Sequence, residues 1–360
     1  MRLSGITTSY LSAVCASGCW LDSERVDEST TVVRGGNREY GYRSRFFGGG
    51  TTWVPSVHIV TTSLGWWCAS NTPCAGYGDH DREFDQFVYD TGVLVASAAG
   101  NGNNTDHVDS PAAGLNVLAV GSYSTSTNTI ASNSSGRKPP NTKNRKPELS
   151  APGVNVWWDL YPPLIVPCND WSTCCNGTSC ATPLVAGLLA DMQEARTWLQ
   201  LNPPLLKARA IAAARDPIGG DSGAVGEGGI DYLKGVNNVS DFWWSGSNSA
   251  FSTWLAPNST FINVPFTFSK GQSVRIVLAW VTRGDYTYAH RNDPPAIDVD
   301  LDLAVYDPSG TCITGSFDSY TGYEIVNFVA ATTGQHSIRI WRIWNRDPSN
   351  KMWIGMVVNR

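Results

Sequence analysis

Short apolar runs alternate with helix-like stretches along much of the chain. The runs at 57–62, 93–99 and 117–121 are typical of buried strands, and a polar and aromatic helix candidate at 81–89 separates the first two. A long helix is predicted from residue 179 to about 199, followed by a second, alanine-rich one. Strands alternating with helices predict βαβ units, and hence an α/β fold with a parallel sheet and flanking helices.

After about residue 250, strands follow one another without helices. Residues 297–305 alternate strictly between aliphatic side chains and the acidic Asp298, Asp300 and Asp302, which predicts a half-buried strand. Further strands are predicted at 274–280, 324–330, 336–341 and 352–358. This part of the chain is therefore expected to form an all-β sandwich or jelly roll.

These patterns divide the chain into two expected domains. An α/β domain covers residues 57–240, and a β-sandwich domain covers residues 250–360. Residues 1–56 have weak periodicity and many Gly, Ser and Arg residues, so they stay unassigned.

Composition and charge exclude several functional classes. The 360 residues carry a net charge of −5 without long runs of one sign, which gives nucleic acid no electrostatic footprint. No apolar run approaches the ~20 residues needed to span a bilayer. Several of the nine cysteines are close in sequence, which favours disulfides and a secreted or extracellular protein. Free buried cysteines are the alternative.

The segment 176–187 carries the most informative chemistry, because it places Ser179 at the start of a predicted helix. A serine there is exposed at the positive end of the helix dipole, and its own N–H can face a developing oxyanion. Serine is also a common helix N-cap, so these residues alone do not establish catalysis.

The wider sequence resembles the subtilisin-like serine proteases, the subtilases of peptidase family S8. The letters G-T-S-x-A-x-P-x-V-A-G around Ser179 are similar to the nucleophile motif of that family. Other segments similar to those of the family occur along the chain in the family's order, at 57–65, 98–101, 110–121, 151–153 and 226–233. The resemblance covers about residues 57–235. It implies a subtilisin-like parallel sheet and a polypeptide substrate.

The resemblance also implies roles for individual residues. Ser179 would be the nucleophile, and Asn101 would supply the oxyanion-hole amide. The segment Ser63, Leu64 and Gly65 would pair with the substrate backbone as an added strand. The residues Ala98, Ala99 and Gly100 would form one wall of the pocket for the residue before the scissile bond.

The Asp and His of the family triad are not found at their family positions. In subtilases both precede the nucleophile, in the motifs D-[ST]-G and H-G-T. No histidine here is followed by glycine, and neither His58, His80 nor His107 matches. The letters of Asp90-Thr91-Gly92 fit, but they fall where a helix-to-strand turn is expected. Asn101 excludes the related sedolisins, which have Asp at that position.

Two explanations follow, and they lead to different functions. The chain is either an N-terminally incomplete fragment of a serine endopeptidase, inactive alone, or a degenerate homologue. The intact motif at Ser179 favours the fragment. The alternative is a non-catalytic pseudoprotease that binds peptides or glycans.

The later region resembles the jelly-roll domain that follows the catalytic domain in many subtilases. Alternation places Asp298, Asp300 and Asp302 on one face of a strand, where three carboxylates repel one another unless a cation intervenes. Calcium is the natural candidate for a structural ion. A solvated acidic face is the alternative, and catalysis itself requires no cofactor.

Overall fold

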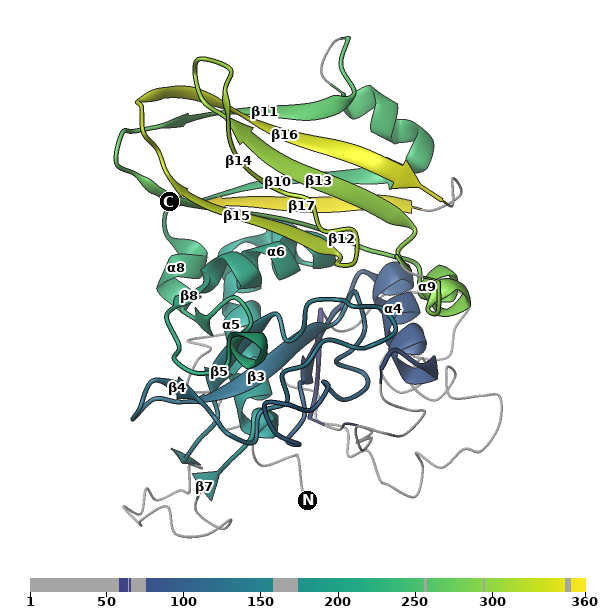
Figure 1. Ribbon diagram of the computed structural model, residues 1–360, viewed down its shortest axis with the longest axis vertical. Helices are drawn as coiled ribbons and strands as arrows, with labels where there is room; N and C mark the ends of the chain where they lie inside the picture. Colours follow the sequence, from purple (N-terminus) through teal and green to yellow (C-terminus); the bar gives the residue numbers. More distant parts are fainter. Residues whose placement is uncertain are drawn as a thin grey trace.

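The computed structural model describes residues 58–63, 65, 76–157, 174–255, 258–293, 295–346 and 351–360. A parallel sheet with its helices comes first, and two antiparallel sheets follow (Figure 1). The expected fold class is confirmed: a mixed α/β region with a parallel sheet precedes a β region.

The central sheet of the described residues has the strand order β1-β2-β3-β5-β9-β8, and β4 pairs with β3. Neighbouring strands from β1 to β9 run parallel, whereas β8 joins β9 antiparallel. Strand β2 is buried throughout and β3 nearly so, which explains their continuous apolar sequence. The strands are β1 Ile59–Thr62, β2 Leu94–Ala98, β3 Leu118–Ser124, β4 Thr129–Ile130, β5 Leu149–Pro152, β8 Ala214–Asp216 and β9 Gly229–Ile230. A separate short pair is formed by β6 Val156–Trp157 and β7 Cys174–Cys175.

Helix α5 is the central helix of this region. Small and apolar residues, among them Ala181, Ala186 and Gly187, are buried along it, and the helix packs against β1, β2, β3 and β5. The helices of the α/β part are α4 Asp79–Thr91, α5 Thr178–Ala195, η1 Thr197–Leu199, α6 Pro203–Ala213, α7 Ser222–Val225 and α8 Tyr232–Val236.

The register of the sheet brings two loops together at one edge. Strands β1 and β2 are parallel, with Thr62 opposite Ser97. Because parallel strands end at the same edge of a sheet, the segments 63–65 and 98–101 leave it side by side. The first turn of α5 lies against the same edge, where Ser63 contacts Ser179.

The antiparallel part consists of two four-stranded sheets with the orders β10-β17-β12-β15 and β11-β16-β13-β14. A shared apolar core of residues from both sheets lies between them. The first strand of this part, β10, begins at Val239. The sequence pattern places the start of the consecutive strands later, after about residue 250. Its elements are β10 Val239–Ser247, η2 Asn248–Trp254, β11 Phe261–Phe268, β12 Ser273–Trp280, α9 Gly284–His290, β13 Val299–Tyr306, β14 Cys312–Ser316, β15 Tyr323–Val329, β16 Gly334–Asn345 and β17 Lys351–Asn359.

Helix α6 joins the two parts. All of its 11 residues are buried, because it lies between the parallel sheet and strands β12 and β17 (Figure 1). Gly355 of β17 makes this contact close: a Cβ there would lie 2.3 Å from Leu205 Cα. The apolar core under α6 therefore includes Val277 and Val357 together with the residues of the parallel sheet.

A buried ionic network also connects α6 with the sheet. The carboxylate of Glu148 lies 2.7 Å from Lys146 Nζ and 2.7 Å from Lys207 Nζ, and all three side chains are almost completely buried. Glu148 Oε2 accepts a hydrogen bond from the Ala119 amide. Burial lowers the pKa of Lys146 to about 8.

The helices of the described residues include none with the length and apolar character of a membrane span.

Candidate active site

Ser179 is the second residue of α5 and stands at the edge where β1 and β2 end. The chain enters the helix through Gly177, whose φ of +127° is rarely adopted by other residues. A Cβ on Gly177 would lie 2.7 Å from Asn101 Oδ1. Glycine at this position therefore allows the start of the helix to approach the loop after β2.

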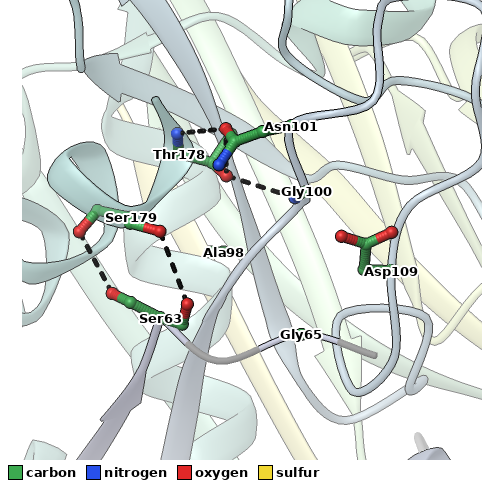
Figure 2. A pocket seen from close by; sticks show the side chains of 8 residues that line it. All are labelled: Ser63, Gly65, Ala98, Gly100, Asn101, Asp109, Thr178 and Ser179. Carbon is green, nitrogen blue, oxygen red and sulfur yellow. Dashed lines mark hydrogen bonds between the residues drawn. The ribbon is translucent and has the colours of Figure 1, made fainter. Parts of the chain in front are cut away.

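Pro183 explains how the segment after β1 is attached to this helix. Proline has no N–H, so the carbonyl four residues earlier, that of Ser179, lacks its usual helical donor. The Ser63 hydroxyl donates to that carbonyl instead, at 3.0 Å. In return, Ser179 Oγ donates to the Ser63 carbonyl at 3.4 Å (Figure 2). The serine in the predicted nucleophile position is thus held beside the predicted substrate-binding segment.

Asn101 follows β2 and Gly100, and its side chain is oriented by Thr178. The Asn101 Oδ1 accepts from the Thr178 backbone N–H at 2.9 Å and from the Thr178 hydroxyl at 3.1 Å. The same hydroxyl accepts from the Gly100 amide at 3.2 Å. Since Oδ1 is occupied, the Nδ2 amide is the group left to bind a ligand, and within the described residues it has no partner. The sequence analysis did not single out Thr178, although it lies within the motif.

The residues around Ser179 enclose a pocket of about 490 Å³. It contains most of the predicted site residues, together with Thr178 and Asp109. Ala99 lies elsewhere: its side chain is buried in an apolar cluster with Val108 and Ala119. Leu64 lies outside the described residues. The pocket is lined by Ser63, Gly65, Ala98, Gly100, Asn101, Asp109, Thr178 and Ser179 (Figure 2).

Asp109 is the charged residue of this pocket. Its backbone N–H donates to the Ala99 carbonyl at 2.8 Å, which places the residue beside the strand that carries Asn101. Burial raises the pKa of the Asp109 carboxyl to about 7, and the negative charge of Asp106 adds to this shift. Sequence reasoning missed Asp109 because it belongs to none of the motifs. Its position directly before Ser110-Pro111-Ala112 was the available signal.

The part of the sequence that forms this pocket is similar to known proteins. The sequence model of the subtilase family, Peptidase_S8, matches residues 54–236, which is half of the chain. The chain belongs to the subtilase family. Its family is one of serine-type peptidases.

Among curated relatives, the chain is similar to the minor extracellular protease Epr of Bacillus subtilis strain 168. The two are 34% identical over 123 residues, which cover 33% of this chain and 17% of Epr. The chain thus spans less than a fifth of that relative's length. Among solved structures, the prenylagaramide maturation protease PagA matches at 23% identity with a TM-score of 0.39, covering 50% of this chain and 62% of that one. The patellamide maturation protease PatA matches at 21% identity with a TM-score of 0.38, covering 49% and 61%.

The histidine and aspartate expected in a subtilase triad do not reach Ser179 within the described residues. No described histidine lines the pocket. His80 lies in α4, and one ring nitrogen of His107 is 2.7 Å from the Lys138 carbonyl. Asp90 and Thr91 end α4, and Gly92 caps the helix with a φ of +75°, which is the turn expected from the sequence. Residues 1–57 lie outside the described part of this subtilase.

A disulfide encloses the start of the nucleophile helix. Cys175 pairs with Cys180, so the segment that contains Ser179 lies within a closed loop. Cys174 is also disulfide-bonded. Cys312 is a free, exposed cysteine. Cys15, Cys68 and Cys168, which also have other cysteines close to them in sequence, lie outside the described part.

The acidic residues of the later region do not form a recognisable metal site. Asp298 is buried just before β13, where its carboxylate accepts from the Thr282 hydroxyl at 2.6 Å and from the Val299 amide at 2.8 Å. Burial raises the pKa of Asp300 to about 6, and neighbouring Asp302 adds to the shift. Among the described residues, no three Asp, Glu, His or Cys side chains gather into a metal-binding group. Calcium binding by this subtilase stays a prediction.

Proposed function

We propose that this chain belongs to a serine endopeptidase that cleaves peptide bonds through an acyl-enzyme on Ser179. One observation carries the proposal: Ser179 Oγ and the Asn101 amide line the same pocket at the edge of the parallel sheet. The backbone N–H of Ser179 adds a second donor, because the first N–H groups of a helix have no helical partner. The Thr178 N–H is already bonded to Asn101, whereas the Ser179 N–H has no partner within the described residues.

The proposed reaction uses these groups in sequence. A peptide substrate lies extended between the segments 63–65 and 98–100 and places its scissile carbonyl above Ser179. A base takes the proton of Ser179 Oγ, which attacks the carbonyl carbon. The developing oxyanion accepts hydrogen bonds from Asn101 Nδ2 and the Ser179 N–H. The amine then leaves, and water hydrolyses the ester. All five histidines of the sequence lie in the described residues and none lines the pocket, so the histidine base would be supplied by another polypeptide segment.

An extracellular location is part of the same proposal. The disulfide between Cys175 and Cys180 is a type of bond that persists in oxidising compartments. The relative Epr is an extracellular protease by its description. Both observations support secretion.

Covalent trapping tests the proposed nucleophile. A peptidyl fluorophosphonate, incubated with the full chain and with imidazole as an added base, is expected to form an adduct that tandem mass spectrometry locates on Ser179. Replacing Asn101 by Ala should slow adduct formation by ~10²–10³-fold, because it removes one oxyanion donor. Asn103→Ala, in the same loop but outside the pocket lining, is the matched control. An adduct on another serine, or equal rates for both variants, would exclude the proposal.

A non-catalytic pseudoprotease that binds peptides is the second candidate. It is favoured by the hydrogen bond from Ser179 Oγ to the Ser63 carbonyl, which takes the place of a bond to a base. Such a protein would bind extended peptides without cleaving them, even when supplied with histidine-bearing segments. Stable peptide binding that Ser179→Ala leaves unchanged, together with no adduct at Ser179, would favour this candidate.

A further inference from the structure

Asp109 is a carboxylate in the pocket that the proposed chemistry does not use. Figure 2 shows it across the pocket from Ser179, beyond Ala98 and Gly100. Within the described residues its carboxylate has no hydrogen-bond donor and no ion-pair partner. Carboxylates that are partly buried without a partner are unfavourable unless a ligand compensates them.

Two glycines make room for this carboxylate in the lining of the pocket. A Cβ on Gly100 would lie 2.4 Å from Asp109 Oδ2, and a Cβ on Gly65 would lie 3.2 Å from the same atom. Both glycines belong to the segments proposed to hold the substrate backbone. Because neither wall has a side chain at this point, the carboxylate stands between them, within reach of a side chain that enters from the substrate.

A second carboxylate lies near Asp109. Asp106, in the same loop, is the neighbouring charge that acts on it, and it raises the pKa of Asp109 further than burial alone. His107 lies between the two in sequence, but its ring is bonded to the Lys138 carbonyl. The pocket therefore has the sign of charge that attracts a cation and repels an acidic side chain.

We propose that Asp109 makes this pocket a subsite for the basic side chain of lysine or arginine at the residue before the scissile bond. This inference rests on the proposed peptidase function, since that function places the substrate backbone along the two glycine-bearing segments. The volume of about 490 Å³ accommodates a long side chain. An aliphatic side chain there would bury Asp109 without a partner, so the pocket selects against it.

A metal ion is a weaker occupant than a basic side chain. Among the described residues, no three potential ligands gather at Asp109. An arginine or lysine head group needs one carboxylate and forms a charge-assisted hydrogen bond with it.

Peptide binding to the full chain with Ser179→Ala, which prevents hydrolysis, tests the inference by calorimetry. The probes are acetyl-Ala-Ala-Ala-Arg and the same peptide ending in citrulline, the neutral isostere of arginine. We expect the arginine peptide to bind ~10- to 100-fold more tightly, the factor that corresponds to a charge-assisted hydrogen bond. The variant Asp109→Asn should abolish that preference.

Asp106→Asn is the matched control, because it removes the same charge from the same loop outside the pocket. It should keep the preference for arginine. As a measurement that needs no pocket variant, benzamidine should bind the Ser179→Ala chain and neutral benzamide should not. Equal binding of the arginine and citrulline peptides, or a preference that survives in Asp109→Asn, would overturn the inference.

The pH dependence gives a further readout with a defined sign. Since the pKa of Asp109 is raised to about 7, the free carboxyl is neutral below pH 7 and charged above it. Binding of the arginine peptide should therefore strengthen as the pH rises from 6 to 8, and that of the citrulline peptide should not. A preference for arginine that weakened as the pH rose would overturn the inference.

The two proposals can fail separately. Adduct formation at Ser179 without a preference for arginine would refute the role of Asp109 and leave the peptidase proposal intact. A preference for arginine that depends on Asp109, without any adduct at Ser179, would refute the nucleophile and support the basic subsite.

Discussion

The polypeptide of this sequence, expressed alone, is expected to show no measurable peptide hydrolysis at neutral pH. A serine hydroxyl is a poor nucleophile until a base removes its proton, and no described histidine lines the pocket of Ser179. Loss of the histidine from a Ser-His-Asp triad costs ~10⁶ in turnover. Labelling by a fluorophosphonate, followed over time, should therefore be slower than in a subtilase with an assembled triad by a similar factor.

Exogenous imidazole provides the positive control for this prediction. Added imidazole should accelerate labelling, because it can act as the missing base, and Ser179→Ala should remove both the slow and the accelerated reaction. Rapid labelling without imidazole that disappears in Ser179→Ala would contradict the prediction. It would mean that a base reaches Ser179 from within the chain, with His58, His80 and His107 the first to be replaced.

Replacing Glu148 by Gln is expected to lower the free energy of unfolding by ~3–5 kcal/mol. Glu148 lies between two buried ammonium groups, Lys146 and Lys207. The substitution leaves both cations without their charge partner in a medium that stabilises charge poorly. Urea denaturation followed by circular dichroism would measure the change from the midpoint and slope.

Two further variants separate charge from packing in this network. Glu194→Gln makes the same chemical change at an exposed position of α5 and should shift stability by no more than ~0.5 kcal/mol. The double variant Glu148→Gln with Lys207→Met removes one of the uncompensated cations and should recover part of the loss. If Glu148→Gln were as harmless as Glu194→Gln, the ionic network would not stabilise the fold.

Helices and strands that show as a continuous run of apolar or small residues could be predicted from the sequence. The buried strand of residues 93–99 and the helix from Ser179 appear as β2 and α5, because continuous apolar runs and small residues reflect burial directly. The alanine-rich helix appears as α6, which begins at Pro203 because proline is favourable in the first turn of a helix. The later strands form two antiparallel sheets, as a β region requires, and their jelly-roll topology stays a prediction.

The parts of the site that depend on tertiary contacts could not be predicted in this way. The motifs place Ser179 and Asn101 in one pocket, but the hydrogen bonds that orient Asn101 come from Thr178, 77 residues away. Asp109 is an ordinary loop residue in the sequence, and its position beside Gly100 emerges from the fold. The alternation around Asp298 suggested an acidic face in contact with water or metal. Asp298 is instead buried, because hydrogen bonds from Thr282 and Val299 satisfy its carboxylate.

Helix α6 determines how far the two parts of the molecule can be treated as separate modules. Its residues complete the apolar core of the parallel sheet on one side and pack against β12 and β17 on the other. The side chain of Asn359, near the C-terminus, donates to the Ala212 carbonyl on the same helix. Removing the two antiparallel sheets would therefore uncover a helix whose residues are all buried in the intact molecule. The α/β part and the antiparallel part are expected to unfold in one cooperative transition. Neither part can be exchanged for another module without redesigning α6.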